Sequence, residues 1–146
     1  MSEFGNIRKA YLDLLGGNIA YRQYPSTGAG TGGVSLTTGN AVWGTSTALL
    51  AASTITTDFW FMGGGCYTGN ANQVYNIQFF GAAATATTPI ILEFTVDLTA
   101  GSTVNVLPVM NIFPIYFQAN SALAARAGGA GNAKTINVFM IYATGL

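Results

Sequence analysis

Apolar and polar residues alternate with a period of two through most of the chain beyond its first 33 residues. The clearest case is 89–98, PIILEFTVDL, where every second residue is apolar and Glu93 and Asp97 lie among the residues between them. Successive side chains of a β-strand point to opposite faces of the sheet, so this pattern predicts a strand with one buried face. Residues 73–81 repeat it.

Further short strand-like segments are separated by turns rich in small and polar residues. They occupy 41–44, 57–69, 104–118, 121–128 and 135–143, and 47–54 fits either a strand or one helical turn. About eight strands at a spacing of roughly ten residues are typical of an all-β sandwich or barrel. We therefore predict an all-β fold, an antiparallel β-sandwich over 34–146, and favour an eight-stranded jelly roll.

The first part of the chain, 1–33, is predicted to form a separate docking arm. Residues 6–17 predict a short helix that Asn6 caps and that Gly16 or Gly17 ends. A helix of this length is unstable alone in water and must pack against something. A strand over 18–24 and a glycine-rich connector complete the arm. The residues of one helical face, and one of the strand, are Ile7, Tyr11, Leu14, Leu15 and Tyr21.

Two of the predicted strands contain unusual residues. The segment 57–69 holds three consecutive glycines, which indicate a bulge or the close approach of another backbone. The segment 104–118 holds Pro108 and Pro114, which favour an edge strand or a bend because proline cannot donate a ladder hydrogen bond.

The last predicted strand has two apolar sides. One side carries Ile136, Val138, Met140 and Tyr142, and the other carries Thr135, Asn137, Phe139 and Ile141. If the first side faces the core, Phe139 and Ile141 need another cover. A neighbouring subunit or the N-terminal helix would supply it.

Composition narrows the possible partners. Only 7% of residues are charged, the formal net charge is zero and histidine is absent, whereas an ordinary soluble domain is about 25% charged. Such a surface is poorly protected against self-association, so we expect much of it to be covered by protein. Five basic and five acidic residues form no basic stripe, which argues against nucleic acid as a partner. We expect no membrane-spanning helix and no signal peptide.

The residue types argue against an enzyme. Without histidine, a Ser-His-Asp or Cys-His arrangement is impossible within the chain. Glu93 and Asp97 would lie about 13 Å apart on an extended strand, beyond the roughly 5 to 9.5 Å of a glycosidase pair. Together with Asp58, these two carboxylates are the candidates for a calcium site. We interpret all three instead as outward-facing residues that keep the protein soluble. We predict no catalytic residues, no cofactor and no metal.

Aromatic residues make up 12% of the chain and keep carbohydrate binding open. Candidate rings and polar partners are Trp43, Trp60, Tyr67 and Tyr75, with Asn70, Asn72 and Gln73. The favoured interpretation is that most of these rings belong to the core, since aromatic side chains dominate such cores.

Three segments carry a resemblance to a known family. They are STITTDFWFMGG (53–64), FPIYFQANSALAARAGG (113–129) and TINVFMIYA (135–143). Over roughly residues 53 to 143 the chain resembles small β-sandwich proteins of tailed-phage structural modules. The resemblance implies a virion protein, a capsid decoration or cement protein that binds the major capsid protein at the head surface as a homotrimer. Related sandwiches in head fibres and tail tips leave a glycan-binding module open, and a self-assembling filament subunit is a third alternative.

The expected contacts combine the arm, the last strand and one arginine. Arg126 ends an alanine-rich run, and we expect it at a strand end, paired with a carboxylate or with a row of carbonyl groups. An arginine that only solubilises a loop is an equal alternative. The predicted contact residues are Ile7, Arg8, Tyr11, Leu14, Leu15, Tyr21, Arg126, Phe139 and Ile141.

Overall fold

The computed structural model describes residues 20–25, 33–83, 88–101 and 103–145, and these residues form strands and turns without a helix. The predicted all-β class is confirmed. The helix predicted over 6–17, with its contact residues, lies outside the described residues. The strands are β1 (Ala20–Tyr24), β2 (Val34–Thr37), β3 (Thr47–Leu50), β4 (Phe59–Gly69), β5 (Val74–Phe80), β6 (Ile90–Asp97), β7 (Thr103–Phe117), β8 (Leu123–Gly129) and β9 (Thr135–Thr144).

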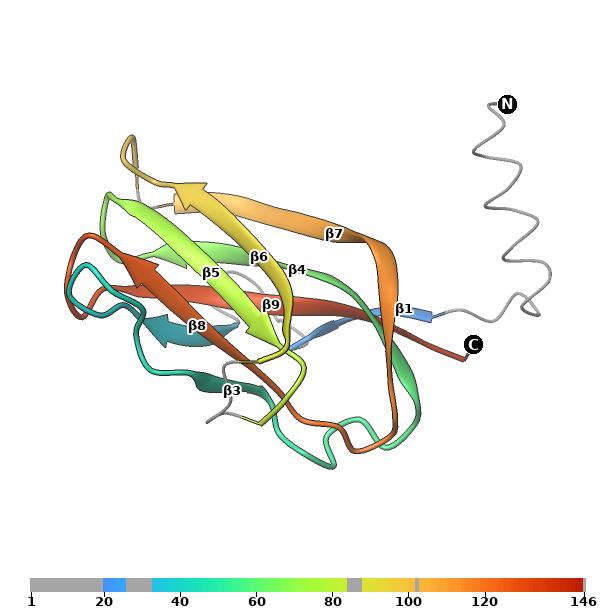
Figure 1. Cartoon of the computed structure of the whole chain (residues 1–146). Coiled ribbons are helices and arrows are strands. Elements are labelled where there is room, and N and C mark those ends of the chain that lie inside the picture. The colour runs from blue at the N-terminus through green and yellow to red at the C-terminus, as the bar shows by residue number, and fades with distance from the viewer. Residues whose placement is uncertain (1–19, 26–32, 84–87, 102, 146) are drawn as a thin grey trace, which may run out of the picture.

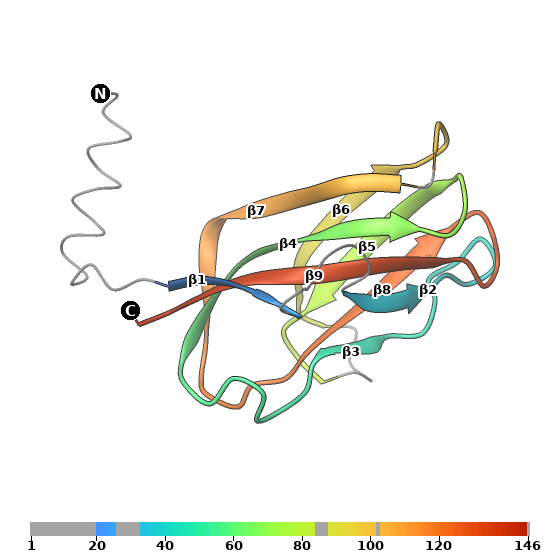
Figure 2. The same cartoon turned by 180° about the vertical axis from the view of Figure 1, so that it is seen from behind.

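Two antiparallel sheets lie face to face as a β-sandwich (Figures 1 and 2). One sheet has the order β1–β9–β4–β7, and β2 also pairs with β9. β1 pairs with β9 over 140–144 and β2 over 135–138, so both lie along one edge of β9. The other sheet has the order β3–β8–β5–β6. Within the described ranges, no helix has the length and apolar character that crossing a membrane requires.

The strand count differs slightly from the prediction. Nine strands are present in the described part of the chain instead of eight. β1, assigned to the arm, pairs along β9 within the sheet, and β2 forms over 34–37, where no strand was predicted, in place of the predicted strand over 41–44. The segment 41–44 is not a strand, since only Trp43 forms an isolated bridge, with Gly128. The segment 47–54 is a strand in its first half, as β3.

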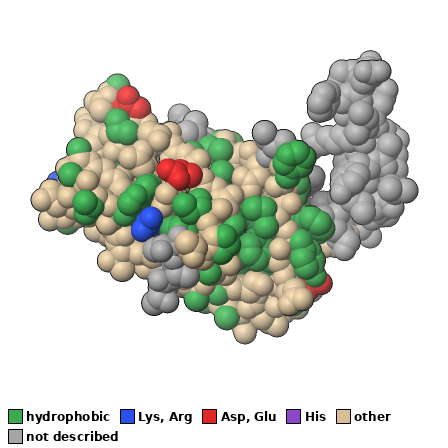
Figure 3. Space-filling view, viewed as in Figure 1, with side chains coloured by type: hydrophobic (Ala, Val, Ile, Leu, Met, Phe, Trp, Pro, Cys, Tyr) green, Lys and Arg blue, Asp and Glu red, His purple; other side chains and the backbone are tan. Residues whose placement is uncertain are grey.

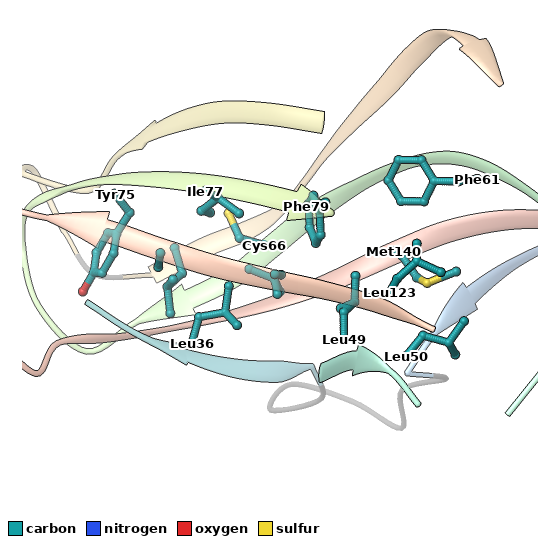
Figure 4. Close-up of a cluster of buried hydrophobic side chains, with 14 of the residues drawn as sticks. Leu36, Leu49, Leu50, Phe61, Cys66, Tyr75, Ile77, Phe79, Leu123 and Met140 are labelled. Carbon is teal, nitrogen blue, oxygen red and sulfur yellow. The ribbon is translucent and has the colours of Figure 1, made fainter. Parts of the chain in front are cut away.

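The core lies between the two sheets (Figure 4). It follows the predicted alternation on β9 and on most of β6, where Ile90 is the exception at 48% exposed. On β9, Ile136, Val138 and Met140 are buried and Tyr142 packs against them, as predicted. Burying such side chains removes apolar surface from water, which is the main favourable term in folding. The other large core side chains include Leu36, Leu49, Leu50, Phe59, Phe61, Tyr75, Ile77, Phe79 and Leu123.

The three glycines of β4 confirm both parts of their prediction. The pairing register of β4 shifts between Phe61 and Gly63, and Gly63 has a φ of 155°. A Cβ on Gly63 would lie 2.1 Å from the carbonyl oxygen of Val109 on the neighbouring strand. A Cβ on Gly64 would lie 2.6 Å from the ring of Phe79, which crosses from the opposite sheet.

β7 is an edge strand with a sharp bend, as its prolines predicted. Ile115 pairs with Phe61 and Met110 pairs with Gly63, so residues 111–114 lie opposite Met62 alone. Figures 1 and 2 show the strand turning at this point. The bend ends one straight run of β7 and starts another.

The second side of β9 is covered in part by the chain itself. Phe139 is 1% exposed, and its ring centroid lies 4.8 Å from that of Tyr67 on β4. The Tyr67 hydroxyl accepts a hydrogen bond from the Gln23 amide of β1. Phe139 therefore offers a partner almost no surface in this conformation, whereas Ile141 is half-buried.

Candidate functional site

Arg126 lies in the middle of β8, so its predicted position at a strand end is wrong. Its guanidinium carbon lies 4.8 Å from the ring centroid of Trp43 and 5.2 Å from that of Phe80. Its Nε donates a 2.9 Å hydrogen bond to Oε1 of Gln78. The Gln78 amide in turn donates to the Glu93 carboxylate at 2.8 Å. Arg126 is thus bound within its own sheet, between two rings and an amide.

This chain of polar contacts follows from strand register. Gln78 of β5 lies opposite Arg126 of β8 and opposite Glu93 of β6. Directly opposed side chains on adjacent strands lie close enough to interact. Gln78 is only 6% exposed, and both the oxygen and the nitrogen of its side-chain amide have a hydrogen-bond partner.

Trp43 is fixed beside this cluster by a glycine. A Cβ on Gly128 would lie 3.1 Å from the Trp43 ring, so the absence of a side chain lets the ring lie against β8. Arg126 contacts the same ring. A cation placed over an aromatic ring contributes about 0.5 to 2 kcal/mol, more as the pair is desolvated. The side chain of Trp43 is therefore held in one place although it is half-buried.

An open groove lies next to Trp43, at the end of the sandwich where several turns meet. We call it the loop-end groove; its volume is about 800 Å³. Trp43, Asn72 and Gln73, three of the carbohydrate-binding candidates, line it together. No pattern in the sequence marked the other lining side chains as candidates, because segments far apart in the chain meet at the groove. These include Val42, Val74, Asn76 and Thr99.

The remaining carbohydrate-binding candidates lie elsewhere. Tyr75 is fully buried and Tyr67 is 8% exposed, which confirms the interpretation of these two rings as buried packing residues. Trp60 packs edge-on against Tyr116, with ring centroids 5.5 Å apart. The side-chain amide oxygen of Asn70 accepts a 2.7 Å hydrogen bond from the backbone nitrogen of Thr135.

Exposed apolar side chains collect on the edge strand around its bend. Met110, Phe113 and Tyr116 are 50%, 81% and 47% exposed. We call these three residues the β7 strip. The Tyr116 hydroxyl donates a 2.7 Å hydrogen bond to Asp58, which also accepts one from the backbone of Ala119 at 2.8 Å. These bonds lower the pKa of Asp58, and the same carboxylate raises the pKa of Tyr116.

The structure does not gather the carboxylates considered for calcium. Asp58 binds Tyr116, Glu93 binds Gln78, and Asp97 accepts from the hydroxyl of Thr99 at 2.6 Å. No group of three metal-ligating side chains occurs in the ranges that the structure describes.

Cys66 is buried between the sheets, and burial raises the pKa of its thiol to about 11. A thiol with so high a pKa is almost entirely protonated near neutral pH and is a poor nucleophile.

Comparisons with known proteins identify no relative of this chain. No protein-family model matches it, and neither a curated protein nor a solved structure does.

Proposed function

We propose that the protein is a non-enzymatic structural protein of a tailed-phage virion. It decorates the head as a homotrimer, binding the major capsid protein and stabilising the shell. The sequence resemblance supports the virion role, and the β7 strip is the observation that carries the self-association. The three side chains of the strip expose apolar surface on an edge strand of a chain that is only 7% charged.

The partner that suits the strip is a second copy of the same chain. Exposed strand edges and apolar patches are the usual sites of association between chains. The segment 103–117 has no charged residue, and the chain has zero net charge, so charge complementarity to a basic or acidic partner is lacking. Figure 3 supports this for one face of the molecule, where charged side chains are few. A closed ring of copies would cover the apolar surface of each.

The strand order supports a jelly roll for β2 to β9. Successive strands mostly alternate between the two sheets, and the first of the eight, β2, lies beside the last, β9. Long connections that return a late strand to lie beside an early one are the mark of Greek-key and jelly-roll folds. β1 then extends the edge of one sheet.

The self-association is tested by sedimentation velocity over a range of protein concentrations. We expect a closed oligomer for the wild type, a smaller species for Phe113→Ser, and retention of the oligomer by Phe113→Leu, which keeps an apolar side chain. Phe113 is 81% exposed, so neither change should alter the folding of one copy. A wild-type monomer at every concentration would contradict the proposal, as would equal behaviour of the two variants. Open fibres in electron micrographs would favour the filament alternative.

The virion role is tested separately. We expect the purified protein to co-sediment with phage heads that lack their decoration protein, and to raise the temperature at which those heads break. The heads are taken from the phage that encodes this chain. Failure to co-sediment, with the oligomer intact, would contradict capsid decoration while leaving self-association in place.

A further inference from the structure

The loop-end groove has the size and lining of a ligand site. Its volume is about 800 Å³, within the roughly 300 to 1,000 Å³ of small-molecule sites. Its walls combine apolar side chains, Trp43, Val42 and Val74, with amide and hydroxyl groups of Asn72, Asn76 and Thr99. Among the residues that the structure describes, no charged one lines it.

Gln73 supplies a buried donor without an acceptor. Its side chain is 9% exposed, and its Oε1 accepts a 2.7 Å hydrogen bond from the backbone nitrogen of Gly131. That bond fixes which end of the amide is the oxygen, since a reversed amide would set two donors against each other. Nε2 is then left without a hydrogen-bond partner, the single such buried side-chain atom in the described residues.

The orphan nitrogen lies against Gly129, next to the β8–β9 turn, and Gln73 itself lines the groove. A Cβ on Gly129, another lining residue, would lie 2.7 Å from Nε2, so the nitrogen occupies space that a side chain would fill. Burial raises the pKa of the neighbouring Tyr75 hydroxyl, and its contacts with the Ala71 carbonyl and the Gln73 amide partly offset the rise. The geometry of the amide contact is too poor to give Nε2 a hydrogen-bond partner. An unmade bond of this kind costs about 1 to 3 kcal/mol. Because Nε2 is fully buried here, the amide must turn toward the groove to donate to a ligand oxygen and recover that cost.

The walls of the groove are held in place before any ligand arrives. Thr38, 3% exposed, donates to the Gly131 carbonyl at 2.6 Å and accepts from the Lys134 backbone at 3.1 Å, which fixes the β8–β9 turn. Arg126 and Gly128 fix the Trp43 ring. A site that is already ordered loses less entropy on binding.

We propose that the loop-end groove binds a neutral carbohydrate. The Trp43 ring packs against the apolar face of a sugar ring, and the Gln73 amide donates to a sugar oxygen. Asn72, Asn76 and Thr99 hydrogen-bond the remaining hydroxyl groups. A neutral polyol suits this lining because it offers many oxygens and apolar C–H faces and needs no cationic or anionic side chain. This binding goes beyond the structural role and does not depend on it.

The ligand is first sought on an array of neutral and sialylated glycans, and then measured by calorimetry with the free oligosaccharide, so that oligomer avidity plays no part. We expect neutral glycans to bind, Trp43→Ala to weaken binding at least about ten-fold, and Trp60→Ala to leave it unchanged. Trp60 is the matched control because it contacts Tyr116 of the β7 strip.

The role of Gln73 as a hydrogen-bond donor is tested on the wild-type protein, so that the test does not depend on the folding of a variant. With nitrogen-15-labelled wild-type protein, the side-chain amide signals of Gln73 should shift on addition of the glycan, while those of Gln78, already doubly bonded, stay in place. Silence of the folded protein on neutral glycans would overturn the proposal. So would binding restricted to sialylated glycans, equal losses from Trp43→Ala and Trp60→Ala, or an unshifted Gln73 amide.

Discussion

A close contact between the two sheets predicts a strong effect of one added methyl group. Gly64 of β4 faces Phe79 of β5, and a Cβ at Gly64 would lie 2.6 and 2.8 Å from two carbons of that ring. It would also lie 2.9 Å from the backbone oxygen of Phe139, which belongs to the paired strand β9. Both neighbours are buried, so neither moves away into solvent. Gly64→Ala therefore forces the sheets apart or the ring out of its rotamer.

The expected cost follows from these distances. Adding a methyl group to a well-packed core destabilises by about 1 to 3 kcal/mol. With a backbone oxygen as well as a ring in the way, we expect Gly64→Ala to cost about 2 to 3 kcal/mol. In a domain of this size each kcal/mol lowers the melting temperature by about 2 to 4 °C.

Urea unfolding followed by tryptophan fluorescence measures this cost, with Gly101→Ala as the matched control. A Cβ on Gly101 would have no neighbour within 4 Å, so this variant should unfold like the wild type. The double variant Gly64→Ala, Phe79→Leu removes the ring edge and should be more stable than the sum of the single effects by about 1 kcal/mol. Relief is incomplete because the Phe139 oxygen remains. Equal stability of Gly64→Ala and Gly101→Ala would refute the close packing of β4 against Phe79.

Three further predictions concern single side chains. Arg126→Ala should lower the free energy of unfolding by about 1 to 2 kcal/mol, and Arg126→Lys should recover less than half, because lysine lacks the planar fork; an Arg126→Lys variant as stable in urea as the wild type would contradict this. Cys66 should resist a thiol reagent near pH 8 in the native protein and react on unfolding, since burial raises its pKa to about 11; rapid native labelling would contradict its burial. The pKa of Asp58 is lowered by its bonds to Tyr116 and Ala119, so the stability difference between the wild type and Asp58→Asn should be fully present above the unfolded pKa of about 4 and be lost as the pH falls from there through the lowered pKa of the folded protein; a pH-independent difference in urea midpoints would contradict it.

The fold class was predictable because the period-two alternation of a strand marks its buried face. This signal does not depend on which residues pack against that face. The β6 pattern in 89–98 and the inner side of β9 needed no knowledge of neighbouring strands. The glycines and prolines were also informative, since each restricts the backbone locally. Gly63 and Pro114 mark a register shift and a bend for reasons that act within a few residues.

Contacts that depend on register were not predictable. Arg126 meets Gln78 because β8 and β5 align at those two residues, which are far apart in sequence. Composition alone pointed to a carboxylate or a row of carbonyl groups, and the structure supplies an amide and two rings from the same chain instead. The groove was half predictable: amide and aromatic residues were recognised as candidates, but the turn that brings Trp43 beside Gln73 was not.

The two proposed surfaces lie apart on the sandwich, and this separation is itself testable. Figures 1 and 2 place the turns around the groove at one end, and the β7 bend toward the other. Sites that share no contacts act additively to within about 0.5 kcal/mol. Phe113→Ser should therefore dissociate the oligomer and leave the affinity for a free oligosaccharide unchanged, whereas its apparent affinity for a glycan-coated surface should fall because avidity is lost. A parallel loss of affinity for the free sugar would mean that a second copy completes the groove, and the two surfaces would then have to be treated as one site.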